Sequence, residues 1–450
     1  MSLSTPAEQT QFGELLVKTL PLVLECFPLP VDARLRAREV SRGWRALLNQ
    51  PRFWLVLDFS AGSGVVARLT RALLFAAGER GRGHLHTLDL TGTEGLRTAH
   101  LAQFATAHGQ SLRSVTAPEG LQFSADEVTR LCHSAPLCTL RCRVYCSAAE
   151  ALPLLRCEAP CALLHVVKLE AGGFDNNEQT VLDLAAALPA HRGKIKGFIV
   201  YQASLENVAV ADALMRGVAE AGVSDVSFNN CLLTPASVPG LAPASLPGLT
   251  QLLQSDCLER LSIFNRMQVL FEEGPDLTAF CHALRSSTLQ KLELKSCQLW
   301  LRPAAAGELL AALLGHQTLQ DLTLLDYKTD DARRAAGEQL ASLFTHTSAL
   351  QKLDLQFNSL GDACLAPIFD ALPRANILKE LIFSESWSNE TISREFARDV
   401  ILPAVRANMS LRRLSFVGLG FFKDPLPELL EAQAIVAART QPDAGAIAAA

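Results

Sequence analysis

"ALQKLDLQFNSLGDACLAPIFDAL", residues 349–372, is the stretch that decides the fold. It has leucines at 350, 353, 355 and 360 and an asparagine at 358, which is the spacing L-x-x-L-x-L-x-x-N-x-L. Apolar residues two positions apart are typical of a short strand with one buried face. The amide of Asn358 is suited to bonding buried backbone groups where the chain leaves that strand. The segment therefore predicts one strand and the turn that follows it.

The same frame recurs through most of the chain, with an average step of about 30 residues. Its first apolar residue stands at positions 85, 112, 137, 164, 195, 223, 258, 289, 319, 350, 378 and 411. Alanine- and leucine-rich stretches of helical spacing, such as 304–318 and 335–349, lie between the copies. Neither strand nor helix can bury its apolar face alone, so the units must stack. An accidental leucine pattern in an α/β domain is the alternative, but the copies from 223 onward keep one frame.

This frame resembles the leucine-rich-repeat family, in the longer strand–helix class typified by ribonuclease inhibitor. The resemblance implies an α/β solenoid, in which a curved parallel sheet lies inside and helices lie outside. We assign about twelve repeats to a domain at 85–422, preceded by a linker or first capping helix at 61–84. Residues 423–450 are expected to form a C-terminal cap and an alanine-rich tail.

One step of the array is long and holds a proline-rich insert, in which residues 235, 239, 243 and 247 are all proline. Prolines at this density exclude a helix interior. We expect a surface loop that replaces or precedes the helix of that repeat. A docking site for a partner that reads proline motifs is the alternative, although the four-residue spacing does not fit a P-x-x-P ligand.

The first sixty residues differ from the repeats. "LPLVLECF" (20–27) is followed by "LPVDARLRAREVSRGWRAL" (29–47) and "QPRFWLVLDFS" (50–60), and apolar residues recur at helical intervals. These segments resemble the F-box family, which implies a small all-α three-helix unit at 10–60. In that family the unit docks on a Skp-type adaptor of a cullin–RING ubiquitin ligase, the SCF type.

The resemblance also assigns roles to individual residues. The adaptor-binding face would comprise Leu20, Pro21, Leu24, Phe27, Val40, Trp44 and Leu47. Trp54 and Leu57 would form the domain junction with the first repeat. A unit of about forty residues is too small to bury two tryptophans internally, so part of this surface must face the solenoid or a partner. A plain N-terminal cap that shields the first repeat is the alternative.

Outward strand positions of the repeats give the candidate substrate surface. Tyr201 and Phe264 are large aromatics at positions where exposure is unfavourable without a partner. Glu293, Lys295 and Asp354 add charges nearby. This mixture suits a protein or peptide substrate. The alternative is that these positions are only variable surface.

Composition excludes several other classes of function. The net charge of −5 argues against nucleic acid, and no apolar segment reaches the length of a membrane span. We therefore expect a protein of the cytoplasm or nucleus, without a membrane partner. Cys138, Cys142 and Cys146 have a spacing that fits neither zinc nor iron–sulfur motifs, so structural thiols are expected rather than a metal site or a reactive cysteine. No motif for a cofactor or for catalysis is present.

Together these features predict a non-enzymatic substrate receptor. It would hold a target protein on the concave face of the repeats and bring it to the ligase for ubiquitination and proteasomal degradation. The alternative is a leucine-rich-repeat interaction scaffold or inhibitor without a ligase role.

Overall fold

The computed structural model describes the chain from residue 55 to residue 439, with gaps. The described ranges are 55–59, 69–81, 83–118, 120–137, 139–156, 163–172, 178–203, 205, 207–233, 246–265, 269–326, 333–346, 349–358, 360–384, 392–417 and 426–439. The F-box-like segment before residue 55, most of the proline-rich insert and the alanine-rich tail lie outside them. The chain forms two compact units, residues 1–170 and 171–450, and each is described by itself.

The second unit is a solenoid of alternating strands and helices. Its strands are β7 (Gly197–Tyr201), β8 (Asp225–Cys231), β9 (Arg260–Asn265), β10 (Lys291–Lys295), β11 (Asp321–Leu325), β12 (Lys352–Leu355), β13 (Glu380–Ser384) and β14 (Arg413–Val417). They pair in chain order, and all the pairs are parallel. Each strand starts two residues after the first apolar residue of its repeat, so the predicted repeat frame is confirmed here.

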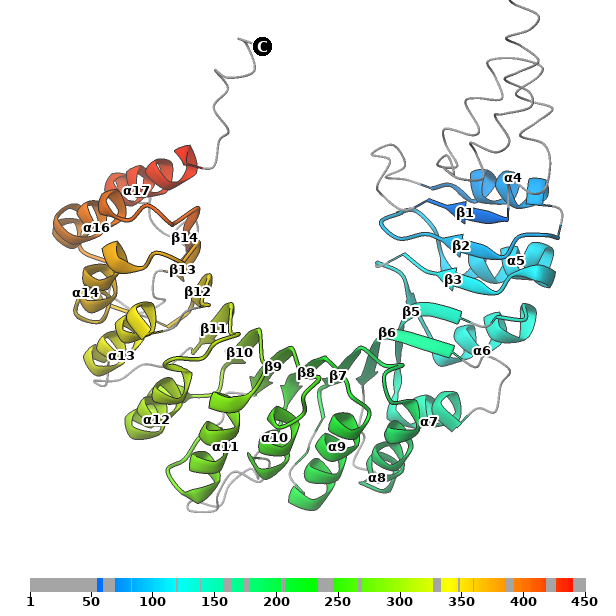
Figure 1. Ribbon diagram of the computed structural model, residues 1–450, viewed down its shortest axis with the longest axis horizontal. Coiled ribbons are helices and arrows are strands. Elements are labelled where there is room, and N and C mark those ends of the chain that lie inside the picture. The colour runs from blue at the N-terminus through cyan, green and yellow to red at the C-terminus, as the bar shows by residue number, and fades with distance from the viewer. Residues whose placement is uncertain are drawn as a thin grey trace, which may run out of the picture. The chain divides into compact units, whose positions relative to one another are not determined.

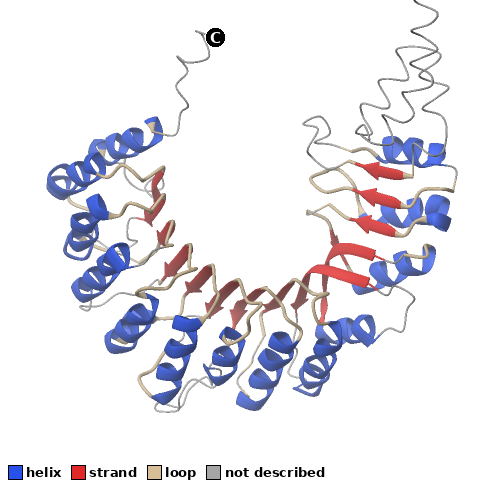
Figure 2. Cartoon of the chain, in the orientation of Figure 1, coloured by secondary structure: helices blue, strands red, loops and turns tan. Residues whose placement is uncertain are grey.

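Helices form the other layer of this unit (Figure 1). They are α8 (Glu178–Ala187), α9 (Val208–Glu220), α10 (Leu246–Leu253), α11 (Pro275–Ser286), α12 (Pro303–Leu313), α13 (Arg333–His346), α14 (Asp362–Ala371), α15 (Arg394–Phe396), α16 (Leu402–Ala407) and α17 (Pro427–Ala438). Within the second unit the strands line the inner side and the helices the outer side (Figure 2). Helix α10 begins at Leu246, so Pro247 lies in its first turn, where proline is tolerated.

Packing between the layers follows the repeat. In the copy that starts at 289, the side chains of Leu289 and Leu292 are fully buried and that of Leu294 is 2% exposed. From the helix side, Leu309 and Leu313 of α12 are fully buried as well. Burial of a leucine side chain stabilises the fold by about 2 kcal/mol, and each repeat supplies several of them. The core therefore runs between strands and helices along the whole unit.

The chain leaves several strands through the same backbone conformation. Gln202, Asn230, Ser296 and Phe357 stand at the eighth position of their repeats and have φ between 50° and 59°. The residue that follows, at the ninth position, is buried in all four repeats. The recurrence of a conformation that is unfavourable for side chains other than glycine shows how strictly the repeat fixes this exit.

The first unit also alternates strands and helices, and its strands β1, β2 and β3 have three residues each. Its elements are β1 (Val56–Asp58), α4 (Arg71–Gly81), β2 (Thr87–Asp89), α5 (Thr98–His108), β3 (Ser114–Thr116), β4 (Gln122–Phe123), α6 (Ala125–Ser134), β5 (Thr139–Ser147) and α7 (Ala148–Arg156). Strands β1, β2, β3 and β5 pair in parallel in this order, and β4 pairs with β5. A capping box starts α6, because Ser124 Oγ accepts from Glu127 N–H at 3.2 Å and Glu127 accepts from Ser124 N–H at 2.9 Å. Strand β6 (Leu163–Gly172) follows in the sequence at the boundary of the units.

One strand lies where the prediction expected the helical unit. Residues 56–58 were assigned to that unit but form β1, whose Leu57 pairs in register with Leu88 and is fully buried. The physical reason is that Leu57 and Phe59 alternate as inward residues, which extends the sheet by one strand before position 85. The bounds of the repeat domain, 85–422, stay a prediction.

Candidate protein-binding surface on the strand face

Charged residues follow one another across the strands of the second unit. We call the following set the charge row: Asp225, Arg260, Lys291, Asp321, Lys352, Glu380 and Arg413. Each member pairs in register with the next on the neighbouring strand. All stand at the third position of their repeats, and every side chain points to the face opposite the helices. Parallel pairing in perfect register thus brings residues about 30 positions apart in the chain side by side.

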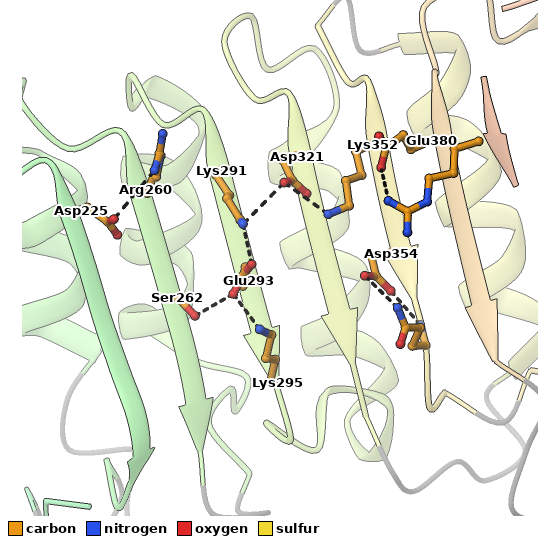
Figure 3. A network of polar contacts seen from close by, with 12 residues as sticks. Asp225, Arg260, Ser262, Lys291, Glu293, Lys295, Asp321, Lys352, Asp354 and Glu380 are labelled. Atoms are coloured by element: carbon orange, nitrogen blue, oxygen red, sulfur yellow. Dashed lines mark hydrogen bonds and ion pairs between the residues drawn. The ribbon is translucent and has the colours of Figure 1, made fainter. Parts of the chain in front are cut away.

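The charges of this row neutralise one another (Figure 3). Asp321 Oδ2 lies 3.6 Å from the Nζ atoms of both Lys291 and Lys352, so one carboxylate serves two strands. At the two ends, Arg260 pairs with Asp225 at 3.9 Å and Arg413 with Glu380 at 3.7 Å. Partly exposed pairs of this kind contribute about 0–1 kcal/mol each. Their main effect is to hold the charged side chains in defined positions on the strand face.

Glu293 lies at the centre of the face and is the most strongly held carboxylate there. Its Oε1 accepts from Lys291 Nζ at 2.7 Å, and its Oε2 accepts from Lys295 Nζ at 2.7 Å and from Ser262 Oγ at 2.9 Å. Burial alone would raise its pKa. The hydrogen bonds and charges of the two lysines outweigh burial and lower the pKa of Glu293 to about 2. This carboxylate is therefore ionised at any physiological pH.

Asp354 has a different environment, although it lies on the same face two strands away. Its carboxylate accepts from the backbone N–H and the side-chain Nε2 of Gln356, both at 3.2 Å. Burial raises the pKa of Asp354, and the nearby charge of Asp321 acts in the same direction, while Gln356 and Lys352 offset only part of it. Asp354 is thus a carboxyl group that is 8% exposed and is hydrogen-bonded by the amide groups of Gln356.

The predicted aromatic residues lie in a second register column, at the carboxyl ends of the strands. Tyr201 pairs with Asn229, Asn229 with Phe264, Phe264 with Lys295, and Lys295 with Leu325. Both aromatic side chains are half-buried. Apolar or aromatic and polar side chains therefore alternate along this column.

All five predicted substrate-binding residues share the strand face. Glu293 and Lys295 contact each other directly, and Phe264 is in register with Lys295. Tyr201 lies two strands from Phe264. The structure thus places the five residues on one surface, and their part in binding remains a prediction.

Sequence reasoning missed the charge row. A signal was present, because the third position of each repeat from 225 to 413 is charged when the copies are aligned by their first apolar residue. The prediction read the fifth and the seventh positions of the repeats, which lie two and four residues further along the strand face. The pairing of opposite charges becomes visible only when the register between strands is known.

Buried polar residues at the strand exits behave as predicted. Asn358 Nδ2 donates to the backbone oxygens of Leu324 and Gln356, and its Oδ1 accepts from Asp326 N–H at 3.0 Å. At the equivalent position, Cys297 Sγ donates to Lys295 O at 3.4 Å. These bonds satisfy carbonyls under the sheet and hold the strand ends in place.

The predicted adaptor-binding residues lie outside the described residues. They are Leu20, Pro21, Leu24, Phe27, Val40, Trp44 and Leu47, and the junction residue Trp54 also lies there. The second junction residue, Leu57, is part of β1 and therefore belongs to the sheet of the first unit. The docking face remains a prediction from the sequence.

The cysteines that the structure describes are mostly buried. Cys142 is 2% and Cys146 3% exposed, on the inward side of β5. Burial, followed by the charge of Glu150, raises the pKa of Cys146 to about 12, which disfavours a reactive thiolate. Within the described ranges no three His, Cys, Asp or Glu side chains are grouped to hold a metal ion. No helix in that part of the chain is long and apolar enough to cross a bilayer.

Comparisons with known proteins add little. No protein-family model matches the chain, and no curated protein matches it. Among solved structures, a chain of the crystal structure of the Rad7 and Elc1 complex in yeast is similar, with 12% identity and a TM-score of 0.41. The match covers 80% of this chain and 95% of that one. A likeness this distant carries no argument about what the present chain binds.

Proposed function

We propose that this protein is a non-catalytic recognition subunit that binds a target protein on the strand face of its second unit. The charge row with Glu293 at its centre is the observation that carries the proposal. Ion pairs between neighbouring strands hold each charge in a fixed place, so the face offers a rigid pattern of both signs. Such a pattern selects one partner by matching its charges and excludes others by misplacing them.

The apolar residues of the face supply the second element of a protein-binding surface. Tyr201 and Phe264 are half-buried, so they keep part of their rings exposed beside the paired charges. Aromatic side chains surrounded by polar groups are frequent anchors of protein interfaces. We infer that these two residues contribute most of the binding energy, and that the charge row determines orientation.

For the N-terminal segment we propose binding to a Skp-type adaptor of a cullin–RING ubiquitin ligase. The support is the F-box-like sequence of residues 20–60, placed directly before a repeat array. In this proposal the chain contributes proximity between target and ligase, while other subunits carry the catalytic thiol. The proposed location is the cytoplasm or the nucleus, where these ligases act.

A pull-down with a purified Skp-type adaptor tests this assignment. The structure sets the limits of the truncation, because Leu55 O accepts from the backbone N–H groups of His86 and Thr87 at 2.7 and 3.1 Å. Removal of residues 1–50 therefore spares β1, whereas removal of residues 1–60 would damage the sheet. We expect the intact chain to bind the adaptor, and the 1–50 deletion and Trp44→Ala to lose binding.

The second candidate is an interaction scaffold or inhibitor that uses the same strand face without a ligase. In this candidate function the strand face still binds a target protein, but the N-terminal segment binds no ligase adaptor. If the intact, folded chain does not bind Skp-type adaptors, the ligase assignment is wrong and the scaffold function is favoured. The two parts of the proposal can thus fail separately.

A further inference from the structure

Two exposed apolar side chains lie in adjacent turns of the second unit, before its last two strands. Met409 stands between α16 and β14 and is 70% exposed, the highest value among the large apolar side chains of the described residues. Ile377 stands between α14 and β13 and is 41% exposed. The two turns contact each other, because Asn408 Nδ2 donates to the backbone oxygens of Leu372 and Ala375 at 2.8 and 3.0 Å. Both side chains therefore belong to one part of the surface.

The repeat itself does not require large apolar residues at these two places. Ile377 directly precedes the first apolar residue of its repeat, where the five copies from 223 to 350 have glycine, cysteine, threonine, threonine and alanine. Met409 precedes that residue by two positions, where the same copies have alanine, aspartate, serine, glutamine and serine. Single exposed apolar residues are common, but two in neighbouring turns form a patch that the fold does not explain.

Hydrogen bonds hold the turn of Met409 in one conformation. Asn408 is 1% exposed, and its Oδ1 accepts from the backbone N–H groups of Ser410 and Leu411 at 3.1 and 2.8 Å. Its Nδ2 fixes the same turn to the preceding one. The backbone at Met409 is thus already ordered before a partner binds, which lowers the entropic cost of binding. The flexible thioether side chain can still adapt to the shape of that partner.

Three exposed basic residues lie in or next to the same two turns. Lys379 Nζ donates to Gln351 Oε1 at 2.8 Å, and Arg412 Nη1 donates to the backbone oxygen of Met409 at 3.1 Å. Arg374 lies between the two carbonyls that Asn408 binds. Within the described ranges, none of the three basic side chains forms an ion pair. We call the following set the rim patch: Arg374, Ile377, Lys379, Met409 and Arg412.

Positive charge gathers beside Met409 without a carboxylate to balance it. Arg406 has its own partner, since its Nη2 lies 2.6 Å from Glu431 Oε1. Arg439, by contrast, donates through Nη2 to the backbone oxygen of Val405 at 2.8 Å. Burial, followed by the positive charge of Arg412, lowers the pKa of Arg439. The two guanidinium groups therefore repel each other, and a carboxylate bound beside Arg412 would relieve this repulsion.

We propose that the rim patch binds a short acidic segment of a partner protein, in which a large apolar side chain stands between carboxylates. The apolar side chain contacts Met409 and Ile377, while the carboxylates bind Lys379 and Arg412. Charge complementarity selects this occupant, because the patch has three basic groups and no acidic one. A bilayer fits less well, since two apolar side chains bury little area in it. The site lies on the turns before β13 and β14 and is independent of the strand face.

Fluorescence anisotropy with labelled peptides tests the proposal on the full chain. The probe is Ser-Gly-Ser-Asp-Glu-Leu-Asp-Glu-Ser-Gly-Ser, and the control peptide has serine in place of leucine, so both peptides carry the same charge. We expect the leucine peptide to bind about ten-fold tighter, because it alone offers an apolar side chain to Met409 and Ile377. We also expect its affinity to fall as the salt concentration rises.

Two variants with matched controls locate the site. Met409→Gln should weaken the leucine peptide about five-fold, whereas Leu430→Gln, at an exposed apolar residue of α17, should leave the affinity unchanged. Lys379→Glu should weaken it about ten-fold, whereas Lys196→Glu, at the equivalent exposed position of the repeat that starts at 195, should have no effect. Far-ultraviolet circular dichroism verifies that each variant is folded.

Four results would overturn the proposal. One is equal affinity for the two peptides, which includes binding of neither. Another is equal weakening by Lys379→Glu and Lys196→Glu, which would indicate attraction by overall charge. The third is displacement of the peptide by single-stranded DNA or by phosphatidylserine vesicles, which would indicate a surface for polyanions or lipid. The fourth is tighter binding by a chain without residues 440–450, which would show that the chain's own tail occupies the patch.

Discussion

The indole Nε1 of Trp300 donates a hydrogen bond to Oδ1 of Asn358 across 2.8 Å, although the two residues are 58 positions apart in the sequence. Both side chains are buried, Trp300 at 4% and Asn358 at 0% exposure. The bond spans the exits of β10 and β12, while Asp326 after β11 joins through its backbone N–H. Three successive repeats are thus linked by one asparagine under the sheet.

This link predicts a large loss of stability for Asn358→Ala. The substitution removes the hydrogen-bond partner of three buried groups. They are the indole N–H of Trp300, the backbone N–H of Asp326 and the backbone carbonyl of Leu324. We expect a loss of about 3 kcal/mol in the free energy of unfolding, measured by urea denaturation. Trp300→Phe removes one partner only and should cost about 1–2 kcal/mol.

A double-mutant cycle of these two positions measures the coupling. Because the residues share a hydrogen bond, the combined loss should be smaller than the sum of the single losses by at least about 0.5 kcal/mol. Simple additivity would contradict the bond. Gln320→Ala, at an exposed position just before β11, serves as the control and should change stability little.

A close approach of two helices predicts the effect of Gly337→Ala. A Cβ atom at Gly337 in α13 would collide with the backbone carbonyl of Cys364 in α14. We expect a loss of about 1–3 kcal/mol in thermal or urea unfolding, because a backbone carbonyl moves only when the helix moves. Gly307→Ala in α12 is the matched control, since its Cβ would meet only the mobile end of Gln339. That control should be neutral or slightly stabilising, and equal losses at both positions would refute the explanation.

The lowered pKa of Glu293 predicts a contribution to stability that depends on pH. Its pKa is 4.5 in the unfolded chain and about 2 in the folded one, so the folded state favours the ionised form. The contribution is therefore complete above pH 4.5 and is lost as the pH falls from 4.5 towards 2. Solvent screening limits it to about 1–2 kcal/mol.

Urea unfolding of the wild type and Glu293→Gln at pH 6 and pH 3 checks this expectation. The wild type should be more stable at pH 6, and the difference should shrink at pH 3. Glu431→Gln, at a side chain that is 50% exposed, is the control and should show a small difference at both values. A constant gap between wild type and Glu293→Gln would exclude titration of Glu293 as its source.

Burial of His316 predicts a second dependence on pH, at higher values. The ring is 1% exposed, and its Nδ1 accepts from Leu319 N–H at 3.2 Å. Burial lowers the pKa of His316 below 6.5, so the folded state holds the neutral ring while the unfolded chain takes up a proton. Stability should therefore fall as the pH drops from 6.5 towards the folded pKa.

The variant His316→Gln separates this effect from other titrations. It should lower stability at pH 8 and flatten the slope of stability against pH between 8 and 5.5, as measured by thermal unfolding. His133→Gln, on the exposed side of α6, should leave the slope unchanged. An unchanged slope in His316→Gln would refute the assignment.

Much of the fold followed from local pattern. The leucines at 350, 353 and 355 predicted a strand in this segment, and β12 spans Lys352–Leu355, because strand and inward face depend on neighbours in the sequence. Strand β1 was missed, since its three residues carry no asparagine or cysteine at the strand exit and overlap with the F-box-like segment. The pairing of Leu57 in β1 with Leu88 in β2 depends on the register between segments about 30 residues apart, and local alternation does not reveal that register.

The candidate surface was predictable only in part. Glu293 and Lys295 were found because they flank an inward leucine on one strand. Their connection to Lys291, and through it to Asp321, requires the register between β10 and β11. The hydrogen bond between Trp300 and Asn358 is still harder to predict from the sequence, because it joins repeats that are not adjacent. Contacts within a repeat are readable from sequence, while contacts between repeats depend on stacking.

The central claim is that the strand face of the second unit binds a protein, and site-specific photocrosslinking tests it most directly. A photoreactive phenylalanine analogue replaces Phe264 on the face in one variant and Ala311 on the exposed side of α12 in the other. In cells of the natural source we predict a discrete crosslinked protein at position 264 that is absent at position 311 and lost when Lys295→Glu is added. The same crosslinked protein at both positions, or one that persists with Lys295→Glu, would contradict the claim.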